Sequence, residues 1–215
     1  GESAREKALI EILNKNPREK KVVFTQYLKS LESIASLLER HGFPFVSFSG
    51  DLSAREKEEA IRRFREELPI LLSTESGGEG RNLQFCNTLV NFDLPWNPMR
   101  IEQRIGRLHR IGQSRDVFIF NLSVRETLED HILHILENKI NMFEMVIGEI
   151  EPLLGHLGEE REFEEIILEI WMQSHDHDEA LSRFEEFGQS LVKAKADYLD
   201  SKALDREIFG EDYEV

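Results

Sequence analysis

The chain has 215 residues, a net charge of −15 and a single cysteine, Cys86. This length is enough to bury a full hydrophobic core, either as one large domain or as one domain with an extension. One cysteine excludes an intramolecular disulfide, and the sequence lacks a signal peptide and a long apolar run, so we expect a cytoplasmic protein with Cys86 buried.

The first half of the chain predicts alternating helices and strands. Apolar residues recur at helical spacing over residues 5–14, and a β-rich run follows over 22–26. A helix is expected over 28–38 with Gly42 as its stop, and then a strand over 45–49. Ser53 and Glu56 form a capping box that begins another helix, which precedes a strand over 70–74.

The alternation continues in the second half. We expect strands over 88–92 and 117–122, a helix over 97–110 that begins at Pro98, and a long amphipathic helix over 127–147. This order predicts an α/β fold with a mostly parallel sheet covered by helices on both faces. In such sheets the functional residues gather at the carboxyl ends of the strands.

The helix over 97–110 carries the strongest chemical signal. Arg107 and Arg110 share one of its faces with Gln103, and Arg104 can flank them. Planar, permanently charged guanidiniums suit a polyphosphate because they bind its oxygens bidentately. A solvated basic face is the alternative, but it does not explain the glutamine at each end of the motif or its two glycines.

Three motifs together resemble one protein family. Residues 103–113, Gln-Arg-Ile-Gly-Arg-Leu-His-Arg-Ile-Gly-Gln, resemble the last motif of superfamily-two helicases. Their ending is similar to the Swi/Snf-type branch, as are Asp93-Leu-Pro-Trp-Asn-Pro98 and the glycine-rich stretch 73–83. Arg104 and Gly106 stand where many Swi/Snf-type members have alanine, so the form is more similar to the bacterial RapA-like branch.

The resemblance implies that residues 1–150 form the second RecA-like lobe of a two-lobed ATP-driven motor. Arg107 and Arg110 would then be catalytic arginine fingers that reach the γ-phosphate of ATP. The sequence contains no phosphate-binding loop with its lysine and no acidic pair for Mg²⁺. By resemblance, those parts belong to a first lobe of the same polypeptide, and the opening Gly-Glu-Ser is typical of an excised fragment. We therefore expect no ATP hydrolysis by this chain alone.

Other residues are candidates for contacts with nucleotide or DNA. Glycines in the stretch 77–80 expose backbone amides to an anion. The resemblance implies that this stretch contacts both ligands. The cofactor-binding candidates are Gln103, Glu75, Gly78 and Gly80. The nucleic-acid-binding candidates are Gln26, Ser49, Gly50, Thr74, Gly77 and Trp96. Trp96 could equally pack its loop against the arginine helix, and Ser53 is better explained as a helix cap.

The acidic charge is concentrated after residue 150. Residues 1–150 contain 21 lysines and arginines against 23 acidic residues, whereas residues 151–215 contain 6 against 19. A break is expected over 151–158, followed by a helix from Phe163 and a second helix over 179–198. Residues 175–178, His-Asp-His-Asp, are better explained as a polar linker than as a metal site. The acidic extension could contact a basic protein partner, mimic nucleic acid or simply remain solvated.

The favoured function is the C-terminal half of an ATPase that translocates along double-stranded DNA. The alternatives are a stand-alone binding or regulatory module, which the retention of both Arg107 and Arg110 disfavours, and a lobe of an RNA helicase. Arg104 and Gly106 fit the RNA helicase, whereas the Trp96-Asn97-Pro98 element and the ending of the arginine motif favour duplex DNA.

Overall fold

The computed structural model describes residues 1–74, 82–108, 116–139, 150–156 and 162–209. The chain divides into two compact units, one of residues 1–95 and 103–125, the other of residues 96–102 and 126–215. The first unit contains the sheet, and the elements of the second are helical. The domain boundary suggested by the sequence, at residue 150, lies inside the second unit.

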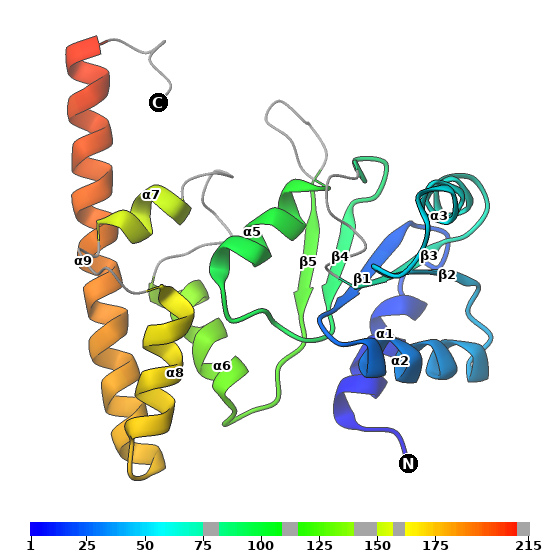
Figure 1. The fold of residues 1–215 in the computed structure, drawn as a ribbon, viewed down its shortest axis with the longest axis horizontal. Coiled ribbons are helices and arrows are strands. Elements are labelled where there is room, and N and C mark those ends of the chain that lie inside the picture. Colours follow the sequence, from blue (N-terminus) through cyan, green and yellow to red (C-terminus); the bar gives the residue numbers. More distant parts are fainter. Residues whose placement is uncertain (75–81, 109–115, 140–149, 157–161, 210–215) are drawn as a thin grey trace. The chain divides into compact units, whose positions relative to one another are not determined.

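A five-stranded parallel sheet forms the first unit (Figure 1). Its order is β2-β3-β1-β4-β5, so the first strand of the chain is the central one. The bounds are Lys21–Thr25 for β1, Phe45–Phe48 for β2, Ile70–Thr74 for β3, Thr88–Asn91 for β4 and Phe118–Asn121 for β5. Each differs by at most one residue at either end from the predicted strand, and the predicted α/β fold with a parallel sheet is confirmed.

The helices of the first unit cover both faces of this sheet. They are α1 (Ala4–Asn14), α2 (Leu28–Arg40) and α3 (Ala54–Glu66), with α5 (Pro98–Gly106) shared between the units. Successive side chains of a strand point to opposite faces. Val23 accordingly packs with α1 and α2, whereas Val22 and Phe24 pack in a second apolar cluster with α3. This places helices on both sides of a buried sheet.

Local sequence signals fix several helix ends. Ser53 and Glu56 form the predicted capping box, and Ser3 and Glu6 form an equivalent one at the start of α1. Each box satisfies backbone N–H groups that have no partner inside the helix. Gly42 follows α2 with a φ of 71°, the left-handed conformation that favours glycine and ends the helix as predicted.

The second unit consists of α6 (Leu128–His134), a π-helical turn η1 (Ile135–Lys139), α7 (Ile150–Gly155), α8 (Phe163–Gln173) and α9 (His177–Phe209). Apolar side chains of these helices form its core, among them Ile132, Leu136, Leu153, Ile167, Phe184 and Leu191. No helix among the described residues is long and apolar enough to cross a membrane.

Three predictions for the second unit need correction. Residues 150–155 form α7 instead of a break, because a proline in the first turn of a helix displaces no intrahelical hydrogen bond. The helix predicted over 127–147 becomes π-helical at Ile135, and residues 140–149 lie outside the described part. The last helix has 33 residues and continues to Phe209, since residues 199–209 include good helix formers and no glycine or proline.

Candidate functional site: the carboxyl edge of the sheet

Parallel pairing brings the ends of the strands to one edge. Thr25 of β1 lies beside Thr74 of β3, and Phe24 lies beside Asn91 of β4. The segments that follow these strands start from the same edge, as predicted. Gln26 follows β1, Ser49 and Gly50 follow β2, and Asp93 follows β4. Residues far apart in sequence are therefore neighbours here.

Asp93, which follows β4, joins the end of that strand to the end of β1. Its carboxylate accepts a hydrogen bond from the Thr25 hydroxyl and one of 2.7 Å from the backbone N–H of Gln26. The Gln26 side chain donates to the backbone oxygen of Leu94 at 3.0 Å. Asp93 is 3% exposed, and this burial raises the pKa of its carboxyl group above the usual value, although Thr25 and Gln26 oppose the shift. The loop after β4 is thus tied to the end of β1.

Arg104 lies beside Arg107 over the Phe24 ring, as predicted, but it is buried. It is 1% exposed, and its Nη1 donates to Asn91 Oδ1 at 2.6 Å and to the backbone oxygen of Asp93 at 3.2 Å. Its guanidinium carbon lies 5.2 Å from the centre of the Phe24 ring, within the range of a cation–π contact. Arg104 therefore anchors α5 to the sheet and is not available to a ligand.

Arg107 lies in a turn beyond the helix. We predicted a helix through Arg110, but α5 ends at Gly106, and residues 107 and 108 donate to oxygens only three residues earlier. The backbone oxygen of Arg107 accepts a 2.9 Å hydrogen bond from the N–H of Leu83, which diverts the chain from the helix. Its half-buried side chain keeps the guanidinium carbon 5.6 Å from the centre of the Phe24 ring. Phe24 thus packs against both the half-buried Arg107 and the fully buried Arg104.

The segment after β2 is held by its own polar contacts. Ser49 is buried and donates a hydrogen bond to Asp51, which lowers the pKa of that carboxyl group. The backbone oxygen of Gly50 accepts from Lys57 Nζ at 3.1 Å. Ser53 serves as the predicted helix cap. These contacts fix the turn that leads into α3.

The remaining candidates differ in exposure. Gln103 is exposed on α5, whereas Thr74 is 3% exposed at the end of β3. Trp96 is half-buried and belongs to the second unit, so it is not placed relative to the sheet edge. Five candidates lie outside the described residues: Arg110, Glu75, Gly77, Gly78 and Gly80.

Sequence reasoning missed the polar network beneath the edge. Asn91 Nδ2 donates to Asn121 Oδ1 at 2.8 Å, which links β4 to β5, while Asn91 Oδ1 accepts from Arg104. A signal was present, since an asparagine ends each of the two strands directly after apolar residues. A buried polar side chain needs a partner, so two such residues on neighbouring strands could have been paired in advance.

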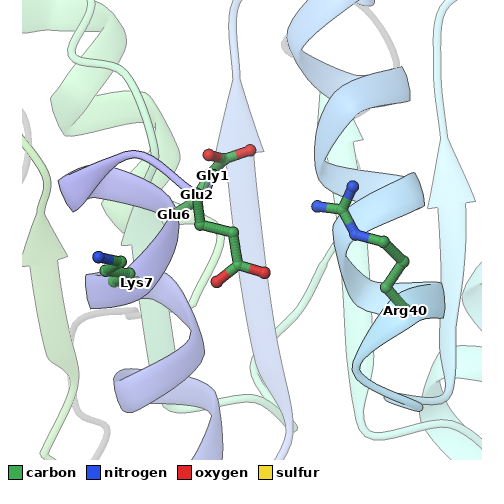
Figure 2. Close-up of a pocket in the computed structure, with 5 residues that line it drawn as sticks. All are labelled: Gly1, Glu2, Glu6, Lys7 and Arg40. Atoms are coloured by element: carbon green, nitrogen blue, oxygen red, sulfur yellow. The ribbon is translucent and has the colours of Figure 1, made fainter.

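Two other features lie apart from this edge. Cys86 is fully buried as predicted; it donates to the backbone oxygen of Lys20, and burial raises the pKa of its thiol to about 11. A pocket is lined by Gly1, Glu2, Glu6, Lys7 and Arg40, and Figure 2 shows Glu6 and Arg40 on either side of it. Because α2 starts at the carboxyl edge and runs back, its last residue Arg40 lies toward the opposite edge.

The burial of Asp93 predicts a specific pH dependence of stability. Its pKa is raised in the folded state, so its protonated form favours folding. This contribution is fully present below the ordinary value of 3.8 and is lost as the pH rises through the higher folded value. We expect the free energy of unfolding of wild type, minus that of Asp93→Asn, to fall over this window. Urea titrations at several pH values measure it; a constant or rising difference would contradict the prediction.

Known proteins provide the final comparison. The family described as "Helicase conserved C-terminal domain" matches residues 4–112. The chain is 43% identical over 161 residues to an "Uncharacterized ATP-dependent helicase YqhH" of Bacillus subtilis, covering 75% of this chain and 29% of that protein. It is 34% identical over 197 residues to "RNA polymerase-associated protein RapA" of Proteus mirabilis, covering 86% of this chain and 20% of RapA.

A solved structure agrees in fold. The "C-terminal part of Fun30 ATPase domain" superposes with a TM-score of 0.58 at 24% identity, covering 81% of this chain and 56% of that one. The chain spans less than a third of the length of the two curated relatives named above. The arginine motif, the parallel sheet and these matches agree, and the chain belongs to the helicase C-terminal domain family, as the second RecA-like lobe of the Swi/Snf-type branch that includes RapA.

Proposed function

We propose that this chain is the C-terminal motor lobe of an ATP-dependent DNA translocase, and that it supplies arginine fingers and part of the DNA track to a first lobe. One observation carries the proposal most strongly. Arg107 is half-buried in a turn beside the carboxyl end of the sheet, while Arg104 next to it is fully buried. A guanidinium that packs on Phe24 and is still partly accessible suits a group that must meet a phosphate in fixed geometry.

The chemistry required of such a lobe is mainly electrostatic. Transfer of a γ-phosphoryl group depends on positioning and on neutralising charge at its oxygens. Arg107 and Arg110 would provide that charge, and Gln103, exposed one turn before Arg107, would lie near the nucleotide. Glu75, Gly78 and Gly80 would complete the contacts to the nucleotide. The first lobe would bind ATP and Mg²⁺ through its phosphate loop.

The DNA track would follow the same edge. Gln26, Ser49, Gly50, Thr74 and Gly77 are the proposed contacts to the DNA backbone, and Trp96 is a further proposed contact to DNA. Ser49 and Thr74 are buried, and the Gln26 side chain already holds Leu94. Backbone N–H groups around Gly50 and at the start of α3 therefore suit phosphate oxygens better than these side chains do.

Duplex DNA is favoured over RNA by two sequence elements. Trp96-Asn97-Pro98 and the ending His109-Arg-Ile-Gly-Gln113 are the forms typical of the Swi/Snf-type branch. Asn97 has a defined local role, because its Oδ1 accepts from the N–H of Met99 at 2.9 Å and begins α5. We further propose that the protein acts in the cytoplasm. The acidic surface of the second unit is the candidate contact for a protein partner.

The proposal predicts where ATP turnover resides. The full-length protein should hydrolyse ATP faster with duplex DNA than alone or with single-stranded RNA. The present chain should bind ATP weakly and show no turnover, because its sequence holds no phosphate loop. Steady-state phosphate release from both proteins, with each nucleic acid, measures this. Turnover by the purified chain above that of its Arg107→Ala variant would contradict the division of labour, and stimulation by RNA alone would favour the RNA helicase.

A further inference from the structure

His131 lies on the buried side of α6. The same side carries Leu128 and Ile132, which are both buried, so the imidazole is directed toward the core of the second unit. The side chain of His131 is half-buried, and its Nε2 atom is buried without a hydrogen-bond partner among the described residues. Buried polar atoms in folded proteins nearly always have a partner, so this position requires a physical explanation.

Aromatic rings from two other helices pack around this imidazole. Its ring centre lies 5.4 Å from that of Phe184 and 5.5 Å from that of His177, both on α9. The ring centre of Trp171 on α8 lies 6.3 Å away. Figure 1 shows α6, α8 and the first turns of α9 beside one another. We call His131, Trp171, His177 and Phe184 the His131 cluster; it joins three helices of the second unit around one titratable side chain.

The surroundings of His131 favour a neutral imidazole. Burial is the main effect that lowers the pKa of His131, because it removes water from the charged form. The imidazoles of His177 on α9 and of His134 on α6 lower this pKa further, since each repels a second positive charge. Asp130 on α6 opposes them, but its carboxylate also accepts a 3.1 Å hydrogen bond from a backbone N–H that precedes α6. Among the described residues, α8 contributes the uncharged Trp171 to this cluster.

We propose that the His131 cluster is a pH-sensitive switch, which holds α6 against α8 and α9 while His131 is neutral and loosens when the imidazole takes up a proton. The protonated ring would bring a second N–H donor and a positive charge between the ring of Phe184 and another imidazole. The attraction of an aromatic face for a cation is weaker than the cost of burying an unpaired charge. Opening the cluster lets water reach both nitrogens, so the proton favours the open form.

The switch has a definite sign of pH dependence. A histidine whose pKa is lower in the folded state favours folding in its neutral form. Its contribution to the free energy of unfolding is fully present above the ordinary value of 6.5 and is lost as the pH falls toward the lower folded value. This sign is opposite to that expected for Asp93 in the first unit. Because His131 takes up one proton, the equilibrium constant for opening can rise by at most about tenfold for each pH unit.

Hydrogen exchange of the 215-residue chain between about pH 5.5 and 7.5 tests the switch. After correction for the intrinsic pH dependence of exchange, peptides that cover α6 and the first turns of α9 should lose protection below pH 6.5, by up to about tenfold per unit. His131→Phe keeps a ring that cannot take up a proton and should abolish this loss, and so should His131→Gln if phenylalanine does not fit. His177→Phe should reduce the loss, because an imidazole that repels the proton is then absent.

His156→Phe is the matched control, since it makes the same change at an exposed histidine of the second unit and should keep the wild-type pH dependence. An NMR titration of the histidines in the wild-type chain needs no variant, and one resonance should show a pKa below 6.5. The absence of such a resonance would overturn the proposal. Protection of α6 that does not change with pH would also overturn it, as would a loss that persists in the His131 variants or stays undiminished in His177→Phe.

Discussion

Replacing Arg107 with alanine in the full-length protein is expected to abolish nearly all DNA-stimulated ATP turnover and to leave duplex DNA binding largely intact. An arginine finger supplied from a second lobe contributes roughly 10³–10⁵ in rate in related phosphoryl-transfer systems. The main chain at Arg107 is held by the N–H of Leu83, so alanine should keep the turn. The lost rate would then report the guanidinium itself.

Two further variants sharpen this experiment. Arg107→Lys should not restore turnover, because a compact ammonium cannot reproduce the planar fork or its stacking on Phe24. Arg18→Ala, at an exposed position before β1 and so at the opposite edge of the sheet, is the control and should keep wild-type turnover. Phosphate release and a filter-binding titration with duplex DNA measure the two activities. If Arg107→Ala kept more than about a tenth of the wild-type rate, Arg107 would not be a finger.

Replacing Arg104 with methionine is expected to destabilise the first unit by about 3 kcal/mol. Methionine preserves much of the side-chain length but removes the donors to Asn91 Oδ1 and to the backbone oxygen of Asp93. It also removes the positive charge that lowers the pKa of the Asp93 carboxyl group and so partly offsets the effect of burial. Arg104→Lys should destabilise the unit less, because a lysine keeps the positive charge. Some loss of stability should remain, because a lysine reaches fewer hydrogen-bond acceptors.

Hydrogen exchange followed by mass spectrometry suits this measurement, because it follows the first unit directly, and neither of the two tryptophans belongs to that unit. Peptides that cover β1 and β4 should lose protection in Arg104→Met, whereas those that cover α9 should not. Arg55→Met is the matched control, since an exposed substitution usually changes stability by less than about 0.5 kcal/mol. Unchanged protection in β1 and β4 would contradict the role of Arg104 as an anchor.

The sequence predicted the sheet well because its strands are short, apolar and bounded by glycines, caps and charged residues. Val22, Val23 and Phe24 face both sides of a buried sheet, so an uninterrupted apolar run was enough to identify the strand. The parallel topology alone predicted that the carboxyl ends of the strands meet at one edge. Gln26, Ser49 and Asp93 were assigned to this edge without knowledge of any contact, and they lie there.

The arginine motif shows where this reasoning ends. Arg104 and Arg107 are three residues apart and chemically identical, yet one is fully buried and the other only half-buried. The different burial of the two arginines depends on their contacts with Asn91, Asp93 and Leu83, which lie outside the motif. The periodicity of the motif carries no information about those contacts. Likewise, the end of α5 at Gly106 depends on the N–H that Leu83 donates to Arg107, a tertiary hydrogen bond.

The order of the strands has a consequence for the synthesis of the protein on the ribosome. β1 is made first but lies at the centre of the sheet, and both of its neighbours, β3 and β4, come later in the chain. Its apolar residues Val22, Val23 and Phe24 have no strand partner until Ile70–Thr74 has emerged from the exit tunnel. Folding of the lobe therefore waits on long-range pairing, and the nascent chain exposes an aggregation-prone strand that a chaperone can protect meanwhile.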